Sequence, residues 1–580
     1  MDQAFFGDEN MGKKPIQTVD LYTEYEAELK NVDIPFSEYP RPQLKRDSYL
    51  CLNGYWDFSV RNNGNVTYDG QIIVPFVPES RISGVKIDIN DGDLIWYERK
   101  ITLPDGFNKG RIILHIGACD QWADLFVNGH NIGWIVDGYI PHALDITELL
   151  CDGENSLRIV ARDDLDINMP YGKQTKNRGG MWYTKVSGLW QTVWLESVPE
   201  NYIKDIKITP DLKGVDIEVI GGEDEKTVIF DGREYRFSGD KLRLDIEDPI
   251  LWTPENPHIY NFKLISGSDS VSSYFGLRTV GITDINGIKR ITLNGKPIFM
   301  HGLLDQGYFP DGIFLPASPR GFEDDILAMK KCGFNMLRKH IKLEPDLFYY
   351  YCDIHGMLVW QDFINNGKYS FLIDTALPTV FLRKGISHKA SELRRGFFLD
   401  TAKGIIERLY NHPSVVYYTI FNEGWGQFDA EGCYDLLKPL DSTRIFDTTS
   451  GWFKAKKTDV ESEHIYFKPI RLKKSDKPIV LSEFGGYSHR VEGHIFNLSN
   501  NYGYRTFDDR SDYEDALVSL YENEVIPAIE KGLCATVYTQ VSDVEDETNG
   551  LLTYDRRVLK VDQVVMQRVA DEIFSAFEKQ

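Results

Sequence analysis

The sequence predicts three folded units in order: a jelly-roll β-sandwich, an immunoglobulin-like β-sandwich and a C-terminal (β/α)₈ TIM barrel. Two sequence patterns lead to this prediction. Up to about residue 285, short apolar runs alternate with Gly and Asn turn signals, and from 286 such runs alternate with helical spacing. The length of 580 residues also suits about three to five domains.

The N-terminal residues 1–40 are polar with few apolar repeats, and we expect an arm that lies over the surface. The first sandwich is predicted over 41–200, where Arg111–Ile116 and Asp124–Val127 are expected to be strands. The second sandwich is predicted over 201–285, with strands such as Val215–Val219 and Ile259–Leu264. Its length of about 85 residues is typical of a small immunoglobulin-like unit.

The barrel is predicted over 286–580, because continuous apolar runs are typical of parallel strands buried on both faces. Helical segments are expected up to Gly333, at 345–356, and near 396–410, 429–438, 512–530 and 558–577. The eight strand candidates are Pro297–Gly302, Phe334–Leu337, Met357–Trp360, Val415–Phe421, Arg444–Asp447, Glu463–Tyr466, Pro478–Leu481 and Cys534–Thr539.

Composition excludes some classes of partner. The formal net charge of −23 disfavours nucleic acid and anionic membrane surfaces. No run of 18 apolar residues suggests a membrane span, and Met1–Asn10 lacks an apolar signal core. The seven cysteines form no CxxC pair, and no metal or cofactor motif is present. We therefore expect a cytoplasmic enzyme without cofactor or metal; a homo-oligomer stays open.

Polar side chains gather where the predicted barrel strands end. Active sites of such barrels form at the C-terminal ends of the strands, so these side chains are expected to share one mouth. Trp425, just beyond the fourth strand, stacks on a sugar or simply packs. The residues at the strand ends are Asp305, Arg338, His340, Asp362, Asn422, Glu423, His464, Tyr466, Glu483 and Gln540.

Two acids follow the most apolar of these strands, Glu423 after the fourth and Glu483 on the seventh. Strands four and seven lie nearly opposite each other across a barrel, so the two carboxyl groups can flank one bond. Glycosidic cleavage needs one carboxylic acid to protonate the leaving oxygen and a second carboxylate to attack or to activate water. A separation of about 5–5.5 Å would give retention of configuration.

The chain resembles glycoside hydrolase family 2 over residues 40 to 580. Leu52-Asn-Gly-Tyr-Trp-Asp-Phe58 resembles the opening of the family's first domain, and Ser187-Gly-Leu-Trp-Gln-Thr-Val-Trp194 its closing strand. Asn411-His-Pro-Ser414 followed by Phe421-Asn-Glu-Gly-Trp425 resembles the acid/base signature, and Ser482-Glu-Phe-Gly485 the nucleophile strand. Together, in this order, the fragments are specific.

The resemblance implies roles for the residues. Glu423 would be the proton donor, with a pKa raised by an apolar wall and the charge of Glu483, the nucleophile. Arg338 would keep Glu483 ionised. Further implied roles are contact of Asn422 with the sugar 2-hydroxyl, donation by Tyr466 to the nucleophile and contact of His340 with sugar hydroxyls.

Other interpretations stay open. His464, Asp305, Asp362 and Gln540 are as readily structural as functional. A non-catalytic carbohydrate-binding protein would keep the fold without turnover, and a metal hydrolase would use His340, His464 and Asp305. The acidic run 543–547 lacks the spacing of a calcium loop.

The substrate is an oligosaccharide or glycoside, and the sequence favours a retaining, exo-acting, β-galactosidase-like enzyme. The Asn-x-Lys motif typical of glucuronidases is missing after Glu483, yet Lys339, Lys342 and Arg490 leave a uronide-active enzyme open. An α-L-arabinofuranosidase of the same family is a further alternative. Two long loops, about 363–392 and 484–511, are expected to wall the mouth.

Overall fold

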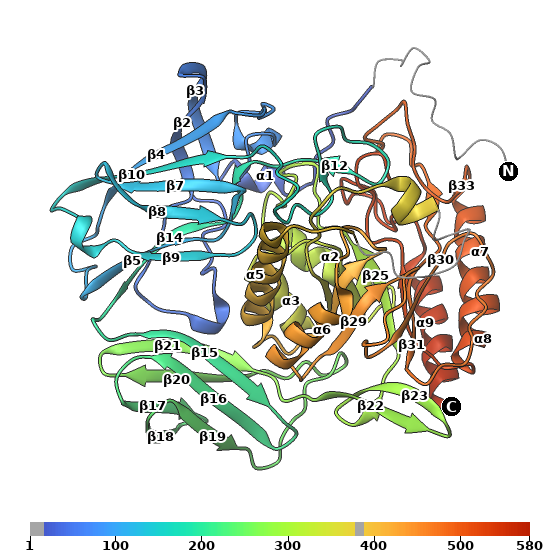
Figure 1. The fold of residues 1–580 in the computed structure, drawn as a ribbon. Helices are drawn as coiled ribbons and strands as arrows, with labels where there is room; N and C mark the ends of the chain where they lie inside the picture. Colours follow the sequence, from blue (N-terminus) through green and yellow to red (C-terminus); the bar gives the residue numbers. More distant parts are fainter. Residues whose placement is uncertain (1–16, 377–387) are drawn as a thin grey trace.

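The computed structural model describes residues 17–376 and 388–580. In Figure 1 the two sandwiches lie on the left, one above the other, and the barrel with its helices lies on the right. Residues 1–16 of the expected arm and 377–387 of the first long loop lie outside the described residues. The three predicted fold types are confirmed.

The first sandwich consists of two antiparallel sheets whose inner faces enclose an apolar core. Trp56 and Phe58 point into this core, whereas Tyr55 beside them is exposed, because side chains alternate along a strand. One sheet has the order β1 (Tyr49–Cys51), β14 (Val193–Val198), β5 (Arg111–Ile116) and β9 (His142–Asp145). The other has the order β3 (Asn65–Val74), β2 (Gly54–Asn62), β4 (Leu94–Thr102), β10 (Glu154–Arg162), β7 (Trp122–Val127) and β8 (His130–Val136).

The second sandwich pairs a three-stranded with a four-stranded antiparallel sheet. The first is β15 (Ile203–Pro210), β16 (Gly214–Gly221) and β19 (Lys241–Asp245); the second is β18 (Arg233–Ser238), β17 (Glu225–Phe230), β20 (Tyr260–Ser266) and β21 (Asp269–Phe275). A small sheet of β22 (Val280–Ile285), β23 (Ile288–Leu293) and β24 (Lys296–Pro297) leads to the barrel. The domain boundaries near 40, 200 and 285 stay predictions.

The barrel is an eight-stranded parallel sheet, and the eight strands predicted from the sequence are present within a few residues of the expected positions. Its strand order is β29 (Ile445–Ser450), β28 (Val415–Asn422), β27 (Leu358–Asp362), β26 (Met336–Lys339), β25 (Met300–Asp305), β34 (Leu533–Tyr538), β31 (Ile479–Phe484) and β30 (Glu461–Ile465). The two strands at the ends of this order, β29 and β30, have no ladder between them, so closure is nearly complete.

Helices surround the barrel on the outside (Figure 1). They are α2 (Arg320–Lys331), α3 (Asp346–His355), α5 (Glu392–Leu409), α6 (Ala430–Leu437), α7 (Arg510–Leu520), the π-helical turn η6 (Tyr521–Val525), α8 (Ile526–Ile529) and α9 (Gln563–Glu578). Residues 451–460 and 466–478, all of them described, contain no helix. Two of the connections expected to be helical in a regular barrel are therefore irregular loops.

One loop of the first sandwich leaves its own domain and reaches the barrel. It follows β10 and carries the short strands β11 (Gln174–Thr175) and β12 (Tyr183–Thr184), and Figure 1 shows β12 above the barrel. The backbone N–H of Tyr171 donates to the carbonyl of Asn365 at 3.1 Å. The Tyr183 hydroxyl donates to Glu547. We call residues 163–187 the bridging loop.

The described part of the arm does more than lie over the surface. Leu21, Tyr25 and Phe36 are buried in the same apolar cluster as the barrel. The backbone N–H of Thr23 donates to Oδ1 of Asp311 at 2.8 Å. The described part of the arm therefore also contributes to this apolar cluster.

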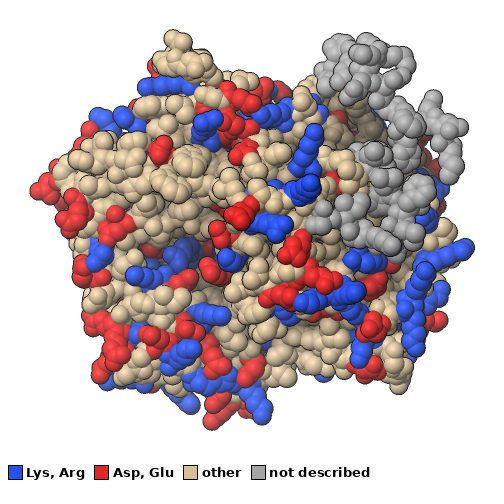
Figure 2. All heavy atoms as spheres, in the orientation of Figure 1, with Lys and Arg blue, Asp and Glu red and all other residues tan. Residues whose placement is uncertain are grey.

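Acidic and basic side chains are interspersed on the face shown in Figure 2. The excess of acids in the whole chain thus coexists with many local pairs of opposite charge. Within the described ranges, no helix has the length and apolar character that crossing a bilayer requires.

A buried charge network joins the two sandwiches. Arg46 pairs with Asp269 of β21 at 2.9 Å and with Glu196 of β14 at 3.2 Å, and all three side chains are almost fully buried. Removing one member of such a network leaves uncompensated charge in the interior, at a cost of about 3–5 kcal/mol.

We therefore expect Arg46→Met to lower the unfolding free energy of the sandwiches by about 3–5 kcal/mol, measured by calorimetry and denaturant titration. The matched control is Arg243→Met, which breaks contacts with Asp211, Asp216 and Asp245 at the surface. Exposed pairs contribute about 0–1 kcal/mol each. Equal losses in the two variants would contradict a structural role for the buried network.

Candidate active site

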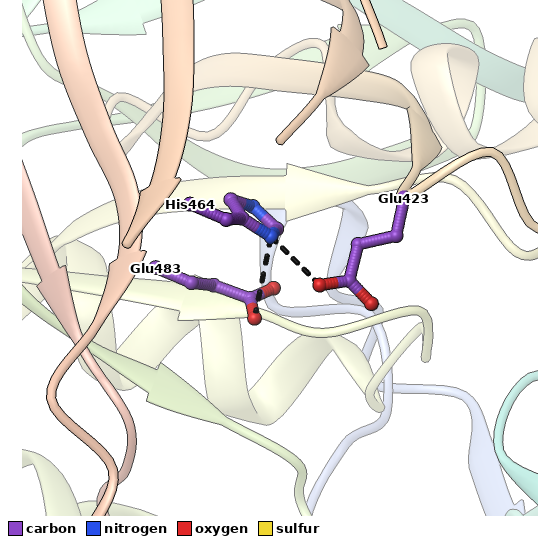
Figure 3. Close-up of side chains that lie close together, drawn as sticks. All are labelled: Glu423, His464 and Glu483. Carbon is purple, nitrogen blue, oxygen red and sulfur yellow. Dashed lines mark hydrogen bonds and ion pairs between the residues drawn. The ribbon is translucent and has the colours of Figure 1, made fainter. Parts of the chain in front are cut away.

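Glu423 and Glu483 face each other inside the mouth of the barrel (Figure 3). Glu423 directly follows β28 with a left-handed backbone, φ 51°, and its N–H donates to the carbonyl of Ser450 at 3.0 Å. Glu483 is the penultimate residue of β31. One carboxylate oxygen of Glu423 lies within 4.8 Å of one carboxylate oxygen of Glu483, and both side chains are buried. The predicted pair is thus brought together.

His464 of β30 lies between the two carboxylates. Its Nδ1 is 2.8 Å from Oε1 of Glu423 and 3.6 Å from Oε2 of Glu483 (Figure 3). Its Nε2 is 3.0 Å from the hydroxyl of Ser450. Burial lowers the pKa of His464 to about 4, so the ring is neutral near pH 7. The imidazole therefore connects the two acids without adding a charge.

Arg338 of β26 lies at the centre of the site and is completely buried. Its Nη1 donates to Oε1 of Glu483 at 3.1 Å and its Nη2 to Oδ1 of Asn422 at 2.8 Å. Its Nε donates to both oxygens of Asp362, at 3.0 and 3.1 Å. One guanidinium thus fixes side chains from three other strands, and Asp362 supports Arg338.

The charges of the two glutamates are set by opposing effects. Burial raises the pKa of Glu423 to about 7, while the charges of Lys173 and Arg338 lower it. Burial also raises the pKa of Glu483, and the neighbouring Glu423 adds to the rise. His464, Arg338 and Tyr466 oppose it. Arg338 therefore acts in the expected direction, although burial has the larger effect on the pKa of Glu483.

The hydrogen bonds around the two acids differ. Glu483 accepts hydrogen bonds from Arg338 and from the Tyr466 hydroxyl, whereas Glu423 contacts the neutral ring of His464. Hydrogen bonds to the charged form favour that form. The surroundings therefore favour the charged form of Glu483 more than that of Glu423.

Unpaired nitrogens surround the two acids. Nδ2 of Asn422, Nε2 of His340 and Nε1 of Trp425 are buried without a hydrogen-bond partner among the described residues. Nδ1 of His340 donates to Gln306 at 3.0 Å, so its Nε2 carries a lone pair. Nε2 of His340 is 3.7 Å from Glu483. The described residues thus leave polar groups beside the two acids without partners.

A chain of hydrogen-bonded amide side chains supports His340 through its Nδ1. Nε2 of Gln306 donates to Oε1 of Gln540 at 2.8 Å, and Nε2 of Gln540 donates to Asn549 at 2.9 Å. Gln540 therefore reaches the site through Gln306. Gln306, which follows Asp305, was not predicted from the sequence.

Aromatic rings wall the mouth. Tyr466 stacks on Tyr504 with ring centroids 3.9 Å apart, and its hydroxyl donates to Glu483. Trp425 lies against Trp182 of the bridging loop at 5.2 Å and Tyr369 at 5.5 Å. Tyr504 and Tyr369 come from the two long loops, which thus contribute walls as predicted; 377–387 lie outside the described residues.

Asp305 is not brought to the carboxylates. Its register partner on β26 is Lys339, and the two side chains form an ion pair at 2.8 Å. Nζ of Lys339 lies 4.6 Å above the ring of Phe348 of α3, outside the strands. The prediction that Asp305 lines the pocket is therefore wrong, because its side chain points from the outer face of the strand towards the helices.

The basic side chains considered for binding a uronate, Lys339, Lys342 and Arg490, contact other groups instead. Lys339 pairs with Glu344 at 2.7 Å as well as with Asp305. Lys342 pairs with Glu344 at 2.9 Å, and Arg490 donates to the carbonyl of Asn497 at 3.0 Å. The basic segment 338–342 thus contributes only Arg338 and His340 to the site.

The cation that reaches the site is Lys173, which was not predicted from the sequence. It lies in the bridging loop and is 5% exposed. Its Nζ lies 5.6 Å from the ring centre of Trp425 and 5.2 Å from that of Tyr183. Among the described residues, no acid is within ion-pair distance of it. Its charge lowers the pKa of Glu423 and that of His340. Burial has the larger effect on both groups, and it raises the pKa of Glu423 but lowers that of His340.

Metal-ligand geometry occurs once among the residues that the structure describes. It consists of Glu423, His464 and Glu483, the same three side chains that form the carboxylate site. The set predicted for a metal hydrolase, His340, His464 and Asp305, is not assembled, because Asp305 pairs with Lys339 outside the barrel.

Three family descriptions match the chain in succession. Residues 68–190 match the glycosyl hydrolase 2 galactose-binding domain-like family, 200–278 match glycosyl hydrolases family 2, and 283–568 match the family 2 TIM barrel domain. Similar curated proteins include a β-galactosidase of Leuconostoc mesenteroides, 23% identical over 525 residues, covering 79% of this chain and 46% of that protein. A putative β-glucuronidase of Formosa agariphila is 23% identical over 452 residues, covering 68% and 50%. The chain thus spans about half the length of these relatives.

Solved structures share the whole architecture. A GH2 β-galacturonidase from Eisenbergiella tayi bound to galacturonate has a TM-score of 0.68 at 19% identity, covering 93% of this chain and 99% of that one. A β-glucuronidase from an uncultured Clostridium species has a TM-score of 0.71 at 18% identity, covering 92% and 99%. At these identities the likeness concerns the fold. With its three domains matched in the family's order, the chain belongs to glycoside hydrolase family 2.

Proposed function

We propose that the protein is a retaining exo-β-glycosidase that removes a terminal sugar by double displacement. The observation that carries this proposal is the distance within 4.8 Å between carboxylate oxygens of Glu423 and Glu483. Retaining enzymes have their two carboxyl groups about 5–5.5 Å apart, whereas inverting enzymes need about 6.5–9.5 Å to admit a water molecule.

Each carboxyl group then has one role in the first step. Glu483 attacks the anomeric carbon and forms a glycosyl–enzyme ester, while Glu423 gives its proton to the departing glycosidic oxygen. In the second step Glu423 takes a proton from water, which attacks the same carbon and releases Glu483. Arg338 and Tyr466 keep Glu483 ionised by donating to it, and Nδ2 of Asn422 is free to meet the sugar 2-hydroxyl.

A β-galactoside is the first candidate substrate, because most of the similar curated proteins are β-galactosidases. The seven cysteines are free and six of them are buried, which is typical of a reducing compartment such as the cytoplasm. A purely carbohydrate-binding role is disfavoured, since a binder does not need an acid and a carboxylate held on opposite sides of one bond.

A uronide is the second candidate, and one observation favours it. Lys173 is a buried cation beside Trp425 with no acidic partner among the described residues. A carboxylate on the sugar would provide that partner. In that case the cation that binds the uronate comes from the bridging loop of the first sandwich, and not from an Asn-x-Lys motif after Glu483.

Trapping with 2-deoxy-2-fluoro glycosides tests the mechanism. We expect mass spectrometry of peptides to find the fluoro sugar on Glu483, and Glu483→Gln to lose labelling and hydrolysis while its thermal unfolding is unchanged. Labelling of another residue, or full activity of Glu483→Gln, would overturn the assignment. Activity is also expected to survive strong chelation, and its loss would favour a metal mechanism at the same three residues.

The pH profile tests Glu423. Because the acid must be protonated and its pKa is about 7, kcat/KM should fall as the pH rises through about 7. Glu423→Ala should lose about 10²–10⁴-fold in rate on glycosides with poor leaving groups and far less on dinitrophenyl glycosides, which leave without a proton. The alkaline fall should disappear in the variant. Equal losses for good and poor leaving groups would contradict the role of proton donor.

A substrate panel tests Lys173. Nitrophenyl β-galactoside, β-glucuronide, β-galacturonide, β-mannoside and α-L-arabinofuranoside are compared for the native chain, Lys173→Met and the control Lys176→Met, whose exposed lysine pairs with Asp91. If uronides are cleaved, Lys173→Met should reduce their kcat/KM by at least about 30-fold, which corresponds to about 2 kcal/mol for a buried charge pair. Cleavage of β-galactosides alone, with no effect of Lys173→Met, would exclude the uronide candidate.

A further inference from the structure

A row of aromatic rings leads outward from Glu483. The Tyr466 hydroxyl donates to Glu483, and the ring of Tyr504 stacks on that of Tyr466 with centroids 3.9 Å apart and 13° between the ring planes. Phe467 meets the ring of Tyr504 edge-on, with centroids 5.2 Å apart. Phe467 itself is 63% exposed. The row therefore begins at a buried carboxylate and ends in solvent.

The local backbone holds these rings in place. The N–H of Tyr504 donates to the carbonyl of Gly486 at 3.0 Å. Gly486 has φ 66°, and a Cβ atom added to it would lie 2.3 Å from the ring of Tyr504, so glycine is required for the stack. The Tyr466 hydroxyl also lies 3.1 Å from that of Thr539. The positions of Tyr466 and Tyr504 are thus fixed by the protein itself.

The row continues to the bridging loop. The ring of Tyr502 lies 6.0 Å from that of Tyr504, and its hydroxyl lies 4.0 Å from Sδ of Met181. The side chain of methionine is flexible and polarisable, and it makes favourable contacts with aromatic rings. Tyr502, Tyr504 and Met181 are all partly exposed. Three loops therefore present adjoining apolar surface beside the mouth of the barrel.

The chemistry of this surface indicates a flat, apolar ligand. Burying a phenylalanine side chain contributes about 1.5–3 kcal/mol, and aromatic pairs contribute about 0.5–1.5 kcal/mol beyond the buried area. A single exposed apolar side chain is common, but Phe467 is continuous with the rings of Tyr504 and Tyr466. Phe467 has no hydrogen-bonding group in its side chain and Tyr504 has one hydroxyl. The hydroxyls of a second sugar would find few partners here, whereas an aromatic ring needs none.

We propose that Phe467 and Tyr504 form the site that holds the leaving group, and that this site prefers an aromatic aglycone. The inference rests on the proposed hydrolysis, because it assigns what lies on the other side of the bond that Glu423 and Glu483 cleave. The glycosidic oxygen takes its proton from Glu423, and the aglycone departs as a free alcohol or phenol. Phe467 contacts the aglycone and takes no part in proton transfer.

A matched pair of substrates tests the preference. Benzyl and cyclohexylmethyl glycosides are prepared with the sugar that the substrate panel identifies. Their leaving alcohols are similar in size and acidity, but only the benzyl group has a flat aromatic ring. We expect kcat/KM of the full-length chain to be about three- to ten-fold higher for the benzyl glycoside, the factor that the energy of an aromatic pair gives. Equal values, or faster cleavage of a disaccharide with the same terminal sugar, would overturn the aromatic class.

Variants of Phe467 locate the preference. Phe467→Leu keeps an apolar side chain and removes the ring, so the benzyl preference should fall to within about two-fold, whereas Phe467→Trp should keep it. The matched control is Tyr55→Leu, since Tyr55 is an aromatic residue of the first sandwich that is 64% exposed. The control should show the native preference. An unchanged preference in Phe467→Leu would overturn the assignment.

Binding without turnover separates this inference from the proposed function. Ligand-observed NMR measures the affinity of 2-naphthol for the native chain, Phe467→Leu and Glu483→Gln. We expect saturable binding that is about three- to ten-fold weaker in Phe467→Leu and unchanged in Glu483→Gln. Full hydrolysis by Glu483→Gln would refute the proposed mechanism, while weaker binding by Phe467→Leu would still support the aromatic site. Equal binding by the native chain and Phe467→Leu would overturn the aromatic site even if Glu483 is labelled.

Discussion

The structure depends on one buried guanidinium. Arg338 of β26 contacts Asp362 of β27, Asn422 of β28 and Glu483 of β31, and it also donates to the carbonyl of Ser482 at 2.9 Å. A cation with no access to water needs all of its donors paired, and acids in the same interior need a cation. This mutual requirement sets the separation of the two glutamates, because both β28 and β31 are tied to the same planar group.

Much of this was predictable from the sequence. Strands such as β28 and β31 begin as apolar runs that end at Glu423 and Glu483, so both the barrel and the pair could be located, although β30 (Glu461–Ile465) is largely polar. Asp305 could not be judged correctly, because a one-residue difference in register decides whether a side chain faces the barrel axis or the helices. Lys173 could not be found, since the bridging loop has no periodic pattern and the contact with Trp425 joins distant parts of the chain. The large effect of burial on the pKa of Glu483 could not be predicted either, because burial is a property of the assembled fold.

The environments of the two glutamates differ although the residues are chemically the same. Glu483 receives hydrogen bonds from a cation and a phenol, whereas Glu423 meets a neutral imidazole. In the mechanism that we propose, this asymmetry separates the attacking group from the protonating one, and it does not depend on which sugar is bound. We propose that the identity of the sugar depends instead on the aromatic wall and on Lys173, which come from loops and from the first sandwich.

The bridging loop affects the order in which the protein folds during its synthesis. The first sandwich leaves the ribosome before any barrel strand has been made, and domains generally fold as units in that order. Residues 163–187 must therefore wait, without their final partners, until Asn365 and the segment around Glu547 have been synthesised. The contacts of Lys173 and Trp182 with Trp425 therefore form only after the first four barrel strands have been made.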